Sequence, residues 1–90
     1  MTLTIRVPTP DDFAAWLPLW LGYNAFYNRP DVPETVTQTL WRRLSASPPV
    51  IHGFIAERDG RVVGLAHYLY HVSTSTLEPN CYLQDLFTAD

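Results

Sequence analysis

The sequence is short of charge and has a single cysteine, four scattered glycines and no long apolar run. Charged residues make up only 17% of the chain and the net charge is −3, so the basic stripe expected of a nucleic-acid-binding protein is missing. One cysteine, Cys81, cannot form an internal disulfide, which fits a reducing compartment. We interpret Cys81 as a buried and unreactive side chain, because no basic residue is near it in the sequence.

Signals for export or membrane insertion are missing as well. The first residues contain no basic segment followed by an apolar run, so we expect no signal peptide. The longest helical apolar segment is interrupted by Pro18, Gly22 and Asn24, which argues against a membrane span. We therefore expect a soluble, cytoplasmic protein with neither a nucleic-acid nor a membrane partner.

Apolar and aromatic side chains, in contrast, are plentiful, at 47% and 13% of the residues. This composition is sufficient for a core and argues against disorder. Ninety residues form one domain at most, and a chain of this size buries only about 60–65% of its unfolded surface. We therefore expect a single domain, residues 1–90, of low stability.

Two helices are predicted after a first strand at residues 3–7. The first helix begins at Thr9-Pro10, and Pro18 within it should kink or break it. The second begins at Pro33-Glu34 and ends before Pro48. The apolar face predicted for the first helix consists of Phe13, Trp16, Leu17, Trp20, Leu21, Asn24 and Tyr27.

Three strands follow, and Asp59-Gly60 has the composition of a two-residue hairpin turn between the first two. The order β-α-α-β-β-β predicts an α+β fold with two helices packed on an antiparallel sheet. The three strands are expected at residues 50–57, 61–72 and 81–88.

The most specific sequence signal lies in residues 62–88. Residues 62–66 read Val-Val-Gly-Leu-Ala, and residues 82–88 read Tyr-Leu-Gln-Asp-Leu-Phe-Thr after a polar connection. This pattern resembles the third and fourth strands of the GNAT superfamily of N-acetyltransferases, and the resemblance extends over nearly the whole chain. It looks closest to the diamine and small-amine acetyltransferases, whose fourth strand often reads Tyr-Leu-Glu-Asp-Leu/Phe-Phe-Val. Gln84 stands where those enzymes have a Glu near the reacting amine. This difference argues against diamine specificity and against a carboxylate that acts directly as the base.

The resemblance implies acetyl transfer from acetyl-CoA to the amine of a small molecule. In the superfamily, an Arg/Gln-x-x-Gly-x-Gly/Ala loop after the fourth strand holds the pyrophosphate of the coenzyme. The glycines at 22, 53, 60 and 64 form no such loop. We therefore expect a GNAT-like half-fold, the amino-terminal part of one acetyltransferase domain with its carboxy-terminal half absent, inactive by itself. The alternative is a non-enzymatic α+β interaction module or a degenerate remnant that pairs through its last strand.

The resemblance assigns the coenzyme to the backbone of Leu86, Phe87 and Thr88, where the strand splays from its neighbour. Gln84 and Asp85 are the candidate catalytic residues. As neighbours in a strand they point to opposite faces, with Tyr82, Gln84, Leu86 and Thr88 on one and Cys81, Leu83, Asp85 and Phe87 on the other.

The Gln84 face borders the amine in the superfamily. Gln84 can hold the amine or orient a water, but it cannot accept a proton at neutral pH. Asp85 is either a hydrogen-bonded structural acid or a general base.

Candidate acceptor-binding residues are Phe26, Tyr27, His67 and Gln84. Phe26 and Tyr27 lie at the end of the first helix, where aromatic rings suit an amine through cation–π contact of about 0.5–2 kcal/mol. His67 is a pocket wall or proton relay, or else a core or surface histidine. His67 and His71 are about 13 Å apart by strand rise, so they cannot share a metal.

The last strand, residues 81–88, is apolar and contains no Lys, Arg or Pro. Such a strand presents unpaired backbone groups to other chains. We therefore expect association, either with a second copy of the chain as a homo-oligomer or with the missing carboxy-terminal half.

Overall fold

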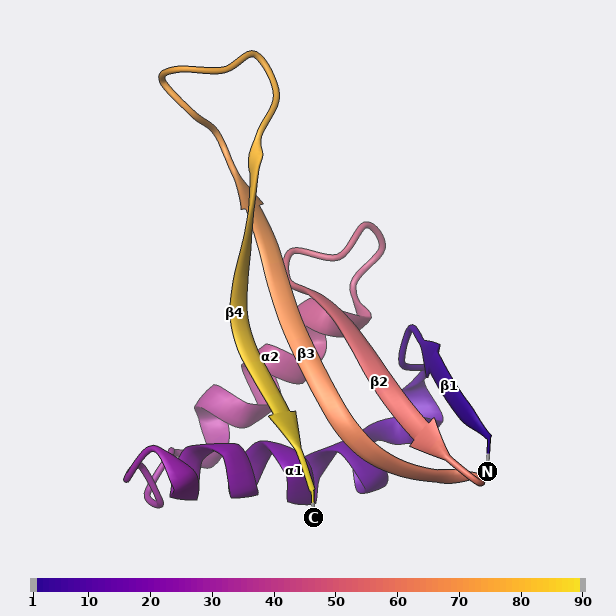
Figure 1. Ribbon diagram of the computed structural model, residues 1–90. Coiled ribbons are helices and arrows are strands. Elements are labelled where there is room, and N and C mark those ends of the chain that lie inside the picture. The colour runs from indigo at the N-terminus through magenta and orange to yellow at the C-terminus, as the bar shows by residue number, and fades with distance from the viewer. Residues whose placement is uncertain (1, 90) are drawn as a thin grey trace.

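The structure, a computed structural model, describes residues 2–89 and has two helices packed against a four-stranded sheet (Figure 1). The sheet order is β1-β2-β3-β4 and every neighbouring pair is antiparallel, which confirms the predicted α+β fold. The elements are β1 (Leu3–Arg6), α1 (Phe13–Phe26), α2 (Glu34–Ser45), β2 (His52–Arg58), β3 (Arg61–His71) and β4 (Asn80–Thr88), with a short 3-10 helix (Pro10–Asp12) before α1.

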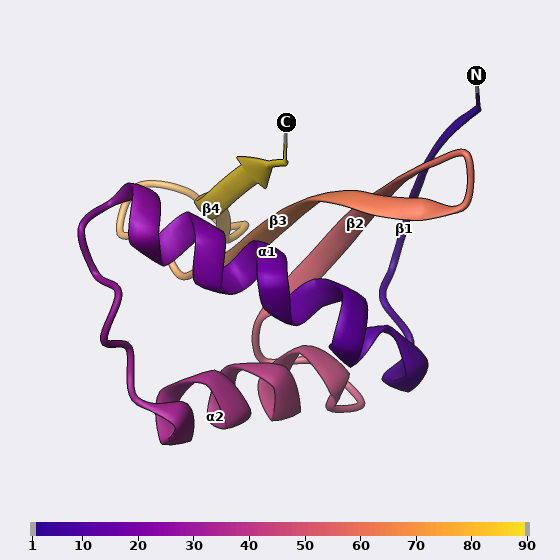
Figure 2. The ribbon, with the colours of Figure 1, turned by 90° about the horizontal axis from the view of Figure 1, so that it is seen from below.

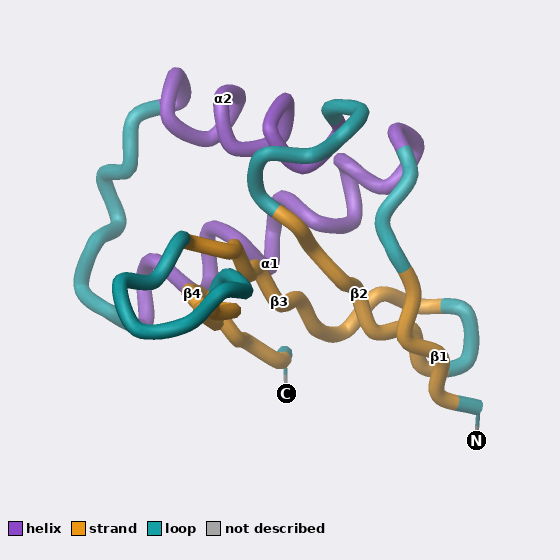
Figure 3. The backbone as a smooth tube through the Cα atoms, turned by 90° about the horizontal axis from the view of Figure 1, so that it is seen from above, coloured by secondary structure: helices purple, strands orange, loops and turns teal. Residues whose placement is uncertain are grey.

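Both helices lie on the same side of the sheet (Figure 2). α1 crosses β3 and β4, whereas α2 packs beside α1 and contacts β2. The two outer strands of the described sheet, β1 and β4, lie at opposite edges (Figure 3). Neither helix of this part of the chain has the length and hydropathy that a membrane span requires.

α1 supplies most of the core, and its buried face overlaps the predicted one, because Trp16, Trp20 and Asn24 are buried as predicted. The two faces differ in part. Leu19 and Tyr23 are buried, whereas Leu21 and Tyr27, both predicted to be buried, are 46% and 55% exposed. The helix is apolar almost all round, so its periodicity alone does not select the side that meets the sheet. The buried apolar residues are Trp16, Leu19, Trp20, Tyr23, Leu44, Ile55 and Leu65.

The sequence predicted a kink or a break at Pro18, and no break occurs. Pro18 has no N–H to donate to the carbonyl of Ala14, yet α1 continues to Phe26. Trp16 and Trp20, on either side of the proline, are both buried against the sheet. Burial of these rings stabilises the helix more than the missing hydrogen bond weakens it.

Arg6 ties β1 to the beginning of α1. Its guanidinium donates to both carboxylate oxygens of Asp12, at 2.8 and 2.9 Å, and also pairs with Glu57 on β2. The hydrogen bond from Arg6 holds the pKa of Asp12 well below its usual range. The N–H of Thr9 also donates to Asp12, at 2.6 Å, so this carboxylate organises the helix start.

The predicted hairpin turn is present between β2 and β3. Asp59 and Gly60 have φ angles of 52° and 82°, the pair of positive values that a type I′ turn requires. Farther along, the β3–β4 hairpin projects beyond the helices (Figure 1). Cys81 lies near the start of β4 and is exposed, so the expectation of a buried cysteine was wrong.

Candidate functional site

β4 contains a β-bulge at Gln84. Asp85 pairs with His67 and Leu83 pairs with Tyr68, which are adjacent residues of β3, so Gln84 is the extra residue between the two pairs. Bulges of this kind redirect side chains and are frequent beside active sites.

The bulge also changes which side chains share a face of the sheet. Because side chains alternate with a period of two, one extra residue reverses the alternation on one side of it. Leu83 and Leu86, paired with Tyr68 and Ala66, therefore lie on the same face. The sequence prediction placed them on opposite faces and was wrong, because regular alternation cannot anticipate a bulge.

Asp85 belongs to a buried chain of hydrogen bonds. Its Oδ2 lies 2.9 Å from His67 Nδ1, and on the other side of the ring His67 Nε2 accepts the indole N–H of Trp16 at 3.0 Å. An indole can only donate, so Nε2 is the acceptor and Nδ1 carries the proton that is donated to Asp85. His67 is 1% exposed and Asp85 is 8% exposed. The ring therefore fixes the orientation of the carboxylate.

Asp85 is held in its ionised form. Burial by itself raises the pKa of this carboxyl group, but the hydrogen bonds from His67 and Tyr23 outweigh burial and lower the pKa below its usual value. Burial, with the hydrogen bond to Asp85, raises the pKa of the Tyr23 phenol. A carboxylate with a lowered pKa is a weak proton acceptor and a good partner for a cation.

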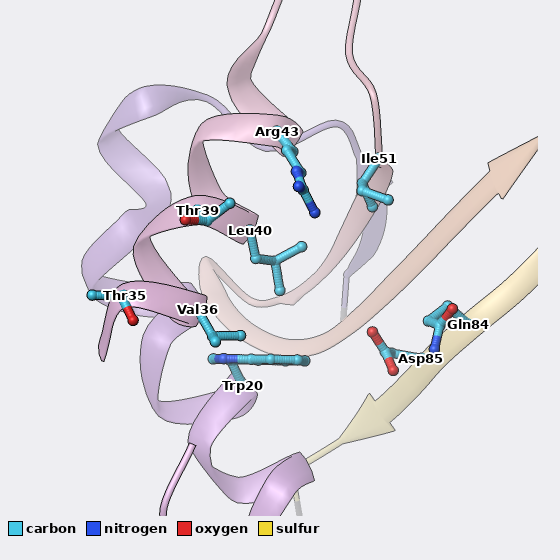
Figure 4. Close-up of a pocket in the computed structure, with 9 residues that line it drawn as sticks. All are labelled: Trp20, Thr35, Val36, Thr39, Leu40, Arg43, Ile51, Gln84 and Asp85. Atoms are coloured by element: carbon cyan, nitrogen blue, oxygen red, sulfur yellow. The ribbon is translucent and has the colours of Figure 1, made fainter. Parts of the chain in front are cut away.

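A pocket of about 460 Å³ lies between α2 and β4. Asp85 points into it from β4 and Arg43 points into it from the last turn of α2, while Trp20 of α1 closes it from below (Figure 4). Gln84 lines the same side as Asp85. The remaining wall consists of Thr35, Val36, Thr39, Leu40 and Ile51.

The outer edge of β4, away from β3, offers backbone groups for a ligand. The N–H of Ala89 donates to the carbonyl of Val63 at 2.7 Å, so Ala89 forms a hydrogen-bonded pair with β3. Such pairs alternate along an antiparallel ladder. Phe87 therefore directs its backbone groups toward β3, and Leu86 and Thr88 direct theirs outward. β4 stays paired with β3 through Thr88, so these groups do not arise from splaying of that pair.

An extended ligand with amide groups, such as the pantetheine arm of coenzyme A, fits this edge in the way that a peptide adds to a sheet. Leu86 and Thr88 suit the predicted coenzyme contact. The Phe87 backbone does not, because it faces β3.

The other predicted acceptor residues lie away from the pocket. Phe26 and Tyr27 are exposed at the end of α1, where the Tyr27 ring centroid lies 5.0 Å from that of Tyr23. His67 does not line the pocket, and its burial prevents direct contact with an acceptor there. Of the predicted substrate-binding residues, the structure therefore brings only Gln84 to the pocket.

Trp20 and Arg43 line the pocket and were not predicted as site residues. The spacing of Val36, Leu40 and Arg43 carried a signal, since residues four and seven apart share a helix face. Across residues 2–89, no three His, Cys, Asp or Glu side chains gather closely enough to hold a metal ion.

Comparison with known proteins agrees with this architecture. The chain is 27% identical over 89 residues to the D-amino-acid N-acetyltransferase HPA3 of Saccharomyces cerevisiae. The chain is related to N-acetyltransferases. The alignment covers 98% of this chain and 55% of the yeast protein, so the chain spans about half the length of this relative. No family model matches the sequence.

Two solved structures share the fold. An acetyltransferase of Trypanosoma brucei superposes with a TM-score of 0.61 and 16% identity, over 98% of this chain and 61% of that one. The PaiA N-acetyltransferase of Thermoplasma acidophilum, in complex with coenzyme A, gives a TM-score of 0.56 and 14% identity, over 98% and 59%. The fold expected from the GNAT resemblance is therefore confirmed.

Proposed function

We propose that this chain forms the acceptor side of an N-acetyltransferase site, at which acetyl-CoA acetylates the amine of a small molecule. One observation carries the proposal. Gln84 and Asp85 line the pocket immediately before Leu86, whose backbone groups face the outer edge of β4. The acceptor pocket and the edge suited to the coenzyme thus meet on one strand. The sequence relation to a D-amino-acid N-acetyltransferase supports this function.

In this proposal the chain acts mainly by positioning. Acetyl-CoA supplies the acetyl group, so an N–C bond forms while the C–S bond of the thioester breaks. The ammonium loses two protons, of which one ends on the sulfur of coenzyme A and the other reaches solvent. Holding two reactants in the correct geometry contributes about 7–11 kcal/mol. Asp85 attracts the ammonium by its charge, and Gln84 hydrogen-bonds the nitrogen. The lowered pKa of Asp85 favours this binding role over that of general base.

The backbone N–H groups of Leu86 and Thr88 hold the coenzyme arm in the same proposal. No glycine-rich loop that opens a helix occurs among the described residues, so the pyrophosphate has no cradle there. We propose that residues 1–90 are the amino-terminal part of an acetyltransferase domain. We expect these residues alone to turn over acetyl-CoA far more slowly than an enzyme that has such a loop.

The function is tested in a protein that contains residues 1–90 together with the rest of the proposed acetyltransferase domain, by release of coenzyme A thiol in the presence of acetyl-CoA and a panel of small amines. We expect Gln84→Ala to lower kcat/KM for the amine and to leave the KM for acetyl-CoA nearly unchanged. Gln38→Ala is the matched control, because Gln38 is exposed on α2 and does not line the pocket. The proposal fails if no amine is acetylated, or if the two variants behave alike.

A further inference from the structure

The pocket between α2 and β4 carries opposite charges on its two sides. Arg43 points into it from α2 and Asp85 from β4, across an interior lined by Trp20 and by aliphatic side chains (Figure 4). Its volume of about 460 Å³ lies within the range of small-molecule sites. A ligand that fills it therefore meets a cation at one end and an anion at the other.

The charge of Asp85 is oriented and that of Arg43 is available. Asp85 accepts hydrogen bonds from His67 and Tyr23, and these fix the carboxylate at the pocket wall. Arg43 forms no ion pair with any carboxylate of residues 2–89, in contrast to Arg6, which binds Asp12. The carbonyl of Arg43 accepts the N–H of Val50 at 3.3 Å, and this bond holds the end of α2 beside the segment that leads into β2.

This arrangement matches an acceptor that is itself a zwitterion. An ammonium group beside Asp85 and Gln84 lies near the coenzyme edge of β4, where transfer must occur. A carboxylate at the other end meets the planar guanidinium of Arg43, which binds carboxylates with two parallel hydrogen bonds. A diamine would place its second cation against Arg43, and this repulsion disfavours it.

We propose that the pocket selects amino acids as acceptors, and that Arg43 is the residue that binds their carboxylate. The inference rests on the proposed acetyl transfer and deepens it by naming the substrate class and a specificity-determining residue. It also explains the departure from the diamine enzymes at Gln84: an acceptor with one amine needs one anionic partner, and Asp85 supplies it.

Matched acceptors test the inference through turnover by the same complete acetyltransferase domain. Both enantiomers of phenylalanine are compared with phenethylamine, which has the same ring and amine but no carboxylate. We expect Arg43→Gln to lower kcat/KM for the preferred phenylalanine enantiomer by about 10- to 100-fold, and for phenethylamine by less than about 3-fold. Arg43→Glu should additionally raise the use of 1,3-diaminopropane. Arg42→Gln, one residue earlier and outside the pocket, should leave both acceptors unaffected.

A binding experiment separates this inference from the proposed function. In ¹⁵N-labelled protein, phenylalanine should shift the indole N–H signal of Trp20, and Arg43→Gln should abolish the shift. Failure of every amine to be acetylated would refute the proposed function, while this titration still decides the role of Arg43. Equal losses for phenylalanine and phenethylamine, or a Trp20 shift that persists in Arg43→Gln, would overturn the inference.

Discussion

Replacing Asp85 by Asn removes the buried charge while keeping the shape of the side chain. The amide oxygen of Asn can still accept the N–H of His67, so the 2.9 Å contact survives as a neutral hydrogen bond. Hydrogen bonds to charged groups contribute about 1.5–3 kcal/mol and neutral ones about 0.5–1.5 kcal/mol. Loss of charge also removes a desolvation cost, so we expect a net loss of about 1 kcal/mol in the free energy of unfolding.

The pH dependence of this loss follows from the lowered pKa of Asp85. A group whose pKa is lower in the folded state stabilises the protein above its unfolded pKa, and that contribution disappears as pH falls through the folded pKa. The difference between wild type and Asp85→Asn should therefore be constant from about pH 7 to pH 5 and shrink below about pH 4.

Urea unfolding followed by tryptophan fluorescence measures the difference at each pH. For a domain of this size, 1 kcal/mol corresponds to a shift in Tm of about 4–8 °C, so thermal melts provide a second reading. Asp31→Asn is the control, since Asp31 is an exposed acid in the connection between the helices. Equal stability of Asp85→Asn and wild type at pH 7, or a deficit that does not change with pH, would refute the reasoning.

Three further predictions concern packing and association. Gly53→Ala should destabilise the fold by about 1–2 kcal/mol, because the new Cβ would lie 2.9 Å from Leu44 Cδ2. In urea titrations, the same substitution should cost less in a Leu44→Ala background than in the wild type. Trp16→Phe should lower the free energy of unfolding by about 1–3 kcal/mol, because it removes the indole N–H and leaves His67 Nε2 without its donor. Trp41→Phe, in the same aromatic cluster, should lower it less, and thermal melts measure both. We also expect residues 1–90 alone to self-associate through the outer edge of β4; light scattering over a concentration series checks it, and a monomer at high micromolar concentration contradicts it.

The fold could be predicted because its signals are local. The positive φ angles at Asp59 and Gly60 follow from residues that tolerate them, and the strands show their alternation directly in the sequence. Pro18 does not break α1, because local propensity is weaker than the burial of the tryptophans around it. Which side of an almost uniformly apolar helix faces the sheet is decided by tertiary packing, which no short window of sequence contains.

The site could be predicted only in part. The motif at residues 82–88 identified Gln84 and Asp85, and the structure brings both to one pocket. The contact between His67 and Asp85 depends on the pairing register of β3 and β4, and this register includes a bulge that alternation does not reveal. Arg43 comes from α2, distant in sequence, so only the fold brings it opposite Asp85.

A crystal structure of the protein with coenzyme A and phenylalanine tests the central claim most directly. We predict that the amino acid lies between α2 and β4, with its nitrogen within hydrogen-bond distance of Asp85 or Gln84 and its carboxylate on Arg43. We also predict that the pantetheine arm lies along the outer edge of β4 at Leu86 and Thr88. An acceptor bound on the opposite face of the sheet, or one in the pocket with its amine turned toward Arg43, would contradict the claim.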